Sequence, residues 1–109
     1  MQGWENLRAE LADALEGEVR FDPVSRALYS TDASMYQIEP IGVVIPRSGE
    51  DVRKTLRIAA GHGAAVLPRG GGTSLAGQTV GRAVVVDFSK YMNQVLALDP
   101  SGGWARIQP

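Results

Sequence analysis

The chain has 109 residues, of which 44% are apolar and 21% are charged, and its formal net charge is −1. This composition fits one globular domain, and the near-neutral charge argues against a general nucleic-acid-binding protein, which needs clustered basic residues. No run of about 18 apolar residues and no basic leader is present, so we expect neither a membrane span nor a signal peptide. Cysteine is absent, which excludes disulfides and thiolate metal sites and fits the cytoplasm.

The first predicted element is an amphipathic helix. Apolar residues recur at helical spacing from Trp4 to Leu15, and Gly17 ends the pattern. The passage from Phe21 to Tyr36 has poor periodicity, and we expect short helical turns there. Residues 1–36 are therefore expected to form an N-terminal helical segment.

From Ile41 onward the pattern alternates between strand and helix. Val43–Ile45 is a β-branched run typical of a buried strand, and Ser48 stands three residues before Asp51, as in a helix N-cap. That helix is expected to close at 61–63, before a second apolar run at 64–67. Residues 43–67 thus predict a right-handed βαβ unit with parallel strands.

The last third of the chain predicts a strand and a hairpin. Ala83–Val86 is a third apolar run, which ends at Asp87. Gln94–Leu98 and Trp104–Gln108 flank a turn-rich stretch and are expected to pair. The fold class is α+β with α/β-like character, and both Trp4 and Trp104 are expected in its core.

The segment Pro68–Gln78 contains Gly70, Gly71 and Gly72, followed by Thr73 and Ser74. Glycine backbone lets several N–H groups converge on an anion, and the hydroxyls add donors. Arg69 is placed to add a cation at the rim. No acidic residue lies between Asp51 and Asp87, and five basic residues do. These features predict a phosphate site after a buried strand, where open α/β sheets bind ligands; the alternative is a flexible solvated turn.

Other candidate chemistry is sparse. His62 lies at a helix end, where complementing the helix dipole is favoured over catalysis, and a lone histidine without cysteine makes no metal site. Asp32 and Asp87 could orient a ligand, although Asp87 at a strand end favours a turn. The glycine segment is not a P-loop, because no Gly-Lys-Ser/Thr follows the glycines. It is not a dinucleotide fingerprint either, because Leu75 stands where the third glycine would be.

Together these motifs resemble a known family. Val44–Ser48, Asp51-Val52, Pro68–Gln78 and Val85–Ser89 are similar in order and spacing to the FAD-binding domain of vanillyl-alcohol oxidase/p-cresol methylhydroxylase-type flavoproteins. Within that superfamily the chain resembles FAD-linked 2-hydroxy acid dehydrogenases, which include D-lactate, glycolate and D-2-hydroxyglutarate dehydrogenases. The stretches 29–36 and 90–93 resemble long bacterial members with a C-terminal iron–sulfur region.

The resemblance implies a cofactor site in the glycine segment. The loop equivalent to residues 69–74 wraps the FAD pyrophosphate, and two later residues lie against the cofactor, so the expected cofactor-binding residues are Arg69, Gly70, Gly71, Gly72, Thr73, Ser74, Gly77 and Gln78. FAD is expected to be non-covalent, because Thr73 stands where some members carry the histidine that attaches the flavin. The family fold has two subdomains around FAD and then a substrate domain. Residues 37–109 would be the first subdomain, in a truncated chain.

The expected function is therefore the FAD-binding portion of an oxidoreductase that oxidises a D-2-hydroxy acid by hydride transfer to flavin. No catalytic or metal-binding residue is expected here, because the catalytic groups and the iron–sulfur cysteines would lie beyond residue 109. The expected partner is a small-molecule substrate, and neither a nucleic acid nor an integral membrane segment is expected. The expected location is the cytoplasm, and peripheral contact of the longer protein with a membrane is left open. Two alternatives remain: a self-contained, non-catalytic nucleotide- or anion-binding module, and a structural domain whose glycine loop contacts a protein.

Overall fold

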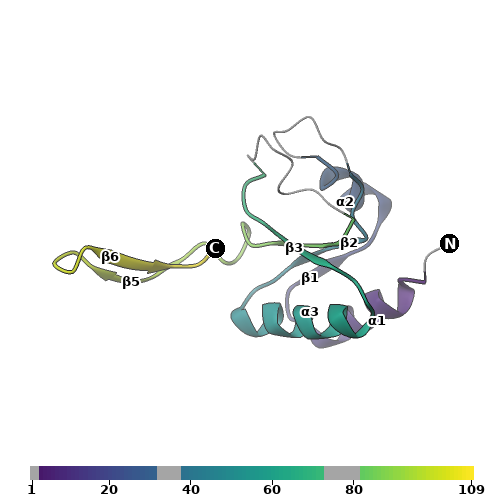
Figure 1. The fold of residues 1–109 in the computed structure, drawn as a ribbon, viewed down its shortest axis with the longest axis horizontal. Coiled ribbons are helices and arrows are strands. Elements are labelled where there is room, and N and C mark those ends of the chain that lie inside the picture. The colour runs from purple at the N-terminus through teal and green to yellow at the C-terminus, as the bar shows by residue number, and fades with distance from the viewer. Residues whose placement is uncertain (1–2, 32–37, 73–81) are drawn as a thin grey trace.

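The computed structural model describes residues 3–31, 38–72 and 82–109. It shows a four-stranded sheet with a helical layer, and a hairpin that extends away from the sheet (Figure 1). The sheet order is β1-β2-β4-β3. The helices and strands have these bounds: α1 Glu5–Ala14, β1 Glu18–Arg20, α2 Pro23–Leu28, β2 Gly42–Ile45, α3 Gly49–Gly61, β3 Val66–Arg69, β4 Val84–Asp87, β5 Val95–Asp99 and β6 Trp104–Ile107.

The three strands predicted from apolar runs form the parallel part of the sheet. Both β2 and β3 pair in parallel with β4, so the predicted parallel orientation of the βαβ unit is confirmed. They are not neighbours, however, because β4 lies between them. All four residues of β2 and of β4 are buried, which explains their unbroken apolar sequence.

Strand β1 was not predicted. It is three residues long and pairs antiparallel with β2, so that Glu18 lies opposite Ile45. A short edge strand with charged residues at both ends carries almost no alternating pattern. The sequence signal for a strand was therefore missing in a segment expected to be helical.

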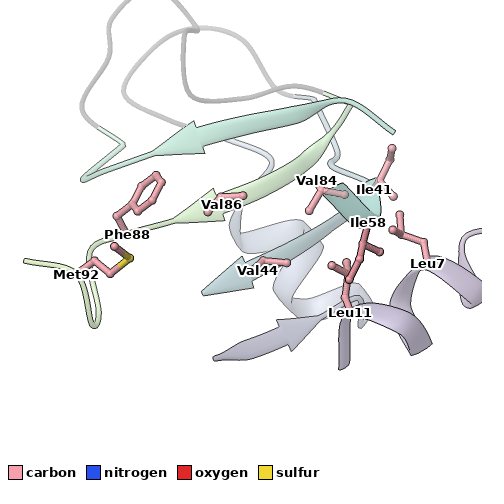
Figure 2. Close-up of a cluster of buried hydrophobic side chains, with 9 residues drawn as sticks. All are labelled: Leu7, Leu11, Ile41, Val44, Ile58, Val84, Val86, Phe88 and Met92. Carbon is pink, nitrogen blue, oxygen red and sulfur yellow. The ribbon is translucent and has the colours of Figure 1, made fainter. Parts of the chain in front are cut away.

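The core lies between the sheet and two helices, α1 and α3, which pack against each other. Leu7 and Leu11 of α1 meet Ile58 of α3 over the buried valines of β2 and β4 (Figure 2). Burying each such side chain contributes about 1.5–3 kcal/mol. The predicted N-terminal segment thus shares a core and a sheet with the rest of the chain, and a boundary at residues 36 and 37 stays a prediction.

Local capping sets the ends of the two later helices. Ser48 caps α3, since its Oγ accepts a hydrogen bond from the Asp51 N–H at 3.2 Å, as predicted. Beyond the end of α3, Gly63 has a φ of +69°, a left-handed conformation that favours glycine. The expected helical turns appear as α2, where Asp22 accepts from the Ser25 N–H at 2.9 Å.

The predicted hairpin of β5 and β6 is confirmed, and it projects from the body of the molecule (Figure 1). Its large apolar side chains are exposed: Val95, Leu96, Leu98, Trp104 and Ile107. Trp4 packs against the core as expected, whereas the expectation for Trp104 was wrong, because this side chain is 51% exposed. The hairpin lies beyond the sheet, so no helix covers the indole.

A carboxylate ties β1 to the segment after β4 and gives the fold a pH dependence. Glu18 accepts hydrogen bonds from Lys90 Nζ at 2.6 Å and from the Tyr91 hydroxyl at 2.5 Å, and it pairs with Arg20. These donors, Lys90 first, hold the pKa of Glu18 at about 2, below the ordinary 4.5. The ionised Glu18 carboxylate therefore stabilises the folded protein fully above its ordinary pKa of 4.5. This contribution is lost as the pH falls towards the folded-state pKa of about 2.

We expect the wild-type protein to lose about 1 kcal/mol more stability than Glu18→Gln between pH 6 and pH 3, a modest figure because the cationic partners are exposed. Urea unfolding of both proteins at the two pH values measures this difference. Glu50→Gln, which removes the exposed pair with Arg53, is the matched control. Equal pH profiles for wild type and Glu18→Gln would contradict the assignment.

Candidate functional site

The carboxyl ends of three parallel strands define one edge of the sheet. Because β2, β4 and β3 run in the same direction, Ile45, Asp87 and Arg69 end their strands on the same side. The glycine segment begins directly after Arg69. This is the edge at which open α/β sheets bind ligands.

Three glycines start the loop, and the third differs from the first two. Gly70 and Gly71 are exposed, and no atom of the described residues lies within 4 Å of a Cβ built at Gly70. Gly72 has a φ of +71°, a backbone conformation that is strained for a residue with a side chain. Backbone conformation therefore accounts for the glycine at 72, whereas the described residues give no steric reason for a glycine at 70.

The side chain of Arg69 turns towards the segment that follows α2. Its Nη2 donates to the Thr31 carbonyl at 2.7 Å, its Nη1 donates to the Tyr29 carbonyl at 3.4 Å, and its Cζ lies 5.2 Å from the centre of the Tyr29 ring. The expected cation is thus at the base of the loop. Its guanidinium is held in place by carbonyl oxygens and an aromatic face.

Next to Arg69, the half-buried Tyr29 and the buried Asp87 form a pair that joins the end of α2 to the end of β4. The Tyr29 hydroxyl donates to Asp87 Oδ2 at 2.5 Å, while Oδ1 accepts from the N–H and the hydroxyl of Ser89 at 2.8 and 2.7 Å. Burial, together with this hydrogen bond, raises the pKa of Tyr29 to about 12, so the phenol stays a donor at neutral pH. The expected turn-forming role of Asp87 is confirmed.

The other basic residues of the acid-free interval do not gather at this edge. Arg53 pairs with Glu50 on α3, and Lys54 Nζ donates to the Ala14 carbonyl at 3.4 Å. Arg57 also lies on α3, and Arg82 precedes β4, so it lies at the amino edge. Of the five, Arg69 is the cation placed at the base of the loop.

Two cations at the carboxyl edge escaped the sequence reasoning. Arg47 follows β2 and stacks on the Tyr91 ring with its Cζ 4.5 Å from the ring centre, and Lys90 lies 5.2 Å from the same ring. Arg47 lies two residues after a predicted strand, which was the available signal. Lys90 is paired with Glu18 of β1, which offsets its charge, so Arg47 is the cation that this pair of residues adds to the edge.

Several predicted residues do not take part or fall outside the described structure. Thr73, Ser74, Gly77 and Gln78, and also Asp32, lie outside the described residues. His62 ends α3, towards the amino edge, where its Nε2 lies 2.8 Å from Glu10 Oε1. Within residues 3–31, 38–72 and 82–109, no cluster of histidine and carboxylate side chains could hold a metal ion. The described helices include none long and apolar enough to cross a membrane.

A glycine-rich loop at the carboxyl edge of a parallel sheet is the arrangement in which many domains bind the phosphates of cofactors. Residues 40–109 match the FAD binding domain family. This match spans well over half of the sequence, and the chain belongs to that family.

The curated relatives of the chain include a dehydrogenase and an oxidase subunit. D-2-hydroxyglutarate dehydrogenase of Escherichia coli (strain K12) is 39% identical over 95 residues, which cover 84% of this chain and 9% of that protein. Glycolate oxidase subunit GlcD of Bacillus subtilis (strain 168) is 35% identical over 99 residues, 87% of this chain and 21% of that protein. The chain thus spans between about a tenth and a fifth of the length of these relatives.

Solved structures confirm the fold class predicted from the sequence. p-Cresol methylhydroxylase with substrate bound superposes with a TM-score of 0.82 at 19% identity, covering 100% of this chain and 23% of that one. 4-Ethylphenol oxidase from Gulosibacter chungangensis gives a TM-score of 0.80 at 25% identity, covering 94% and 21%. The chain is an α+β FAD-binding domain, homologous to FAD-linked D-2-hydroxy acid dehydrogenases.

Proposed function

We propose that the chain is the first FAD-binding subdomain of a longer dehydrogenase that oxidises a D-2-hydroxy acid. The observation that carries the proposal is the 39% identity to a D-2-hydroxyglutarate dehydrogenase over 84% of the chain. The glycine loop at the carboxyl edge supports it, because this loop stands where a pyrophosphate would bind. The bound flavin would supply the hydride-accepting chemistry.

The residues present fit such a cofactor. Gly70 and Gly71 are exposed and carry no side chain, so an anion can approach their backbone closely. We assign the pyrophosphate to the backbone of Gly70–Gly72, with the positive charge of Arg69 beneath it, and extend the site to Thr73, Ser74, Gly77 and Gln78. FAD is proposed to be non-covalent, because the chain has no cysteine and His62 lies away from this edge.

The exposed apolar surface of the hairpin is evidence for a further subdomain in the same protein. Val95, Leu98 and Ile107 are 63%, 68% and 65% exposed on a two-stranded ribbon, and such a ribbon is marginal by itself. Exposed apolar surface of this kind marks a contact with other protein. We assign that contact, the catalytic groups and any iron–sulfur cysteines to the remainder of the protein. The cytoplasmic location stays a prediction.

The proposal predicts that the full-length protein purifies with one non-covalent FAD and that a D-2-hydroxy acid bleaches the flavin absorbance. Acid or urea denaturation followed by filtration should release all the flavin. Yellow flavin that survives with the protein on a denaturing gel would contradict the non-covalent assignment. A flavin that no D-2-hydroxy acid reduces would contradict the substrate class.

The isolated residues 1–109 are the control for the two-subdomain site. Half of the cofactor contacts would be missing, and each ~1.4 kcal/mol lost weakens affinity tenfold. We therefore expect FAD binding at least about 100-fold weaker than in the full-length protein, and no dehydrogenase activity. Submicromolar FAD affinity of the isolated chain by calorimetry would instead favour a self-contained nucleotide-binding module.

A further inference from the structure

We propose that Arg69 is a positioning residue: its guanidinium is a platform on which Gly72 rests, and it acts on a bound pyrophosphate through the loop backbone. The part that concerns flavin rests on the proposed function. The platform itself is an arrangement of this chain's own residues.

Within the described part of the chain, residues 29–31 contribute contacts that hold the guanidinium. Nη2 donates to the Thr31 carbonyl at 2.7 Å, Nη1 to the Tyr29 carbonyl at 3.4 Å, and the Tyr29 ring lies 5.2 Å from Cζ. The ring is itself fixed, because the Tyr29 hydroxyl bonds Asp87, which is 7% exposed. A planar guanidinium held by these contacts has one face available to the loop.

The loop touches that surface at Gly72. A Cβ built on Gly72 would lie 2.5 Å from Nη2, 3.1 Å from Cζ and 3.2 Å from Nε of Arg69. The Gly72 backbone therefore lies directly against the guanidinium, and the contact sets where this part of the loop lies. The φ of +71° favours glycine at 72, and a Cβ there would in addition displace the guanidinium.

The two roles open to Arg69 make different demands on its chemistry. A cation that contacts phosphate directly needs charge, which lysine also supplies. A platform needs a planar group that bonds carbonyl oxygens and stacks on a ring, and lysine cannot replace it there. The contacts to Tyr29, Thr31 and Gly72 favour the platform.

The first test compares Arg69→Lys with Arg69→Met in the full-length protein. We expect both variants to weaken FAD binding by a similar factor, about tenfold or more, as read from flavin fluorescence. Hydrogen exchange of the backbone amides at 69–72 should rise in both variants without FAD. The opposite result would be an FAD affinity of Arg69→Lys within about threefold of wild type and a much lower affinity of Arg69→Met. It would overturn the platform in favour of a direct charge contact.

The second test is a double-mutant cycle between Arg69→Ala and Gly72→Ala. Their effects on FAD affinity should be strongly non-additive, because the clash at position 72 disappears with the guanidinium. Gly63→Ala is the matched control: its φ is +69°, and no described atom lies within 4 Å of its Cβ. It should leave FAD affinity unchanged. Additive effects would overturn the proposal.

A failure of the proposed function is distinguishable from a failure of the platform. If the wild-type protein bound no FAD, the proposed function would fall, while amide exchange in the flavin-free protein would still report on the loop. Unchanged exchange at 69–72 in Arg69→Lys and Arg69→Met would overturn the platform whether or not flavin binds.

Discussion

Replacing Asp51 with alanine is expected to lower the free energy of unfolding by about 3–5 kcal/mol, a large share of the 5–15 kcal/mol typical of small domains. The carboxylate is 2% exposed and accepts three backbone hydrogen bonds, from Glu16 at 3.0 Å, Gly17 at 2.8 Å and Arg47 at 3.0 Å. Alanine would leave these N–H groups without their acceptor, at about 1–3 kcal/mol each before relaxation and water are allowed for.

The site of Asp51 is also closely packed. A Cβ on Gly17 would lie 2.2 Å from the Ile45 carbonyl oxygen and 3.0 Å from Asp51 Oδ2, so the loop after α1 lies directly against the end of β2. Loss of the carboxylate would therefore release the α1–β1 connection from the sheet. This loop reaches β1, the strand that the sequence did not predict.

Urea unfolding measures the effect, and Glu50→Ala, at the exposed position directly before Asp51 in α3, is the matched control. The control should change the unfolding free energy by less than about 0.5 kcal/mol. Asp51→Asn, which keeps one oxygen acceptor, should fall between wild type and alanine. A loss of less than about 1 kcal/mol for Asp51→Ala would show that the three bonds do not hold the loop.

Gly71→Val is expected to abolish flavin retention in the full-length protein while leaving its fold intact. Gly71 is exposed, and the positive φ of the described part of the loop lies at Gly72, so valine at 71 meets no strained backbone. Its side chain would occupy the space through which a pyrophosphate approaches the main chain. The expected result is a colourless protein with a wild-type unfolding profile.

The flavin-to-protein absorbance ratio after gel filtration is the measurement, and His62→Ala is the control. His62 lies at the end of α3 beside Glu10 and should keep its full flavin content when replaced. A Gly71→Val protein that retained its flavin would show that the exposed glycine backbone is not the pyrophosphate cradle. An unfolded Gly71→Val protein would contradict the expectation that position 71 tolerates a side chain.

The sequence by itself determined the elements whose signals are local. The valine runs of β2 and β4 needed only burial on both faces, Ser48 and Asp51 defined a cap within one turn, and the turn residues at 99–103 fixed the hairpin. The glycine segment could also be found and placed after a strand, because φ restrictions and side-chain volume are properties of single residues.

Only the tertiary structure decided which distant groups meet. β4 enters between β2 and β3, Tyr29 bonds Asp87 across 58 positions, and Asp51 binds a loop 34 residues away. The Arg69 guanidinium turns to the carbonyls after α2, and Trp104 stays exposed on a projecting hairpin. Pairing of this kind depends on how separate elements pack, and periodicity and capping, which act within about one helical turn, carry no information about it.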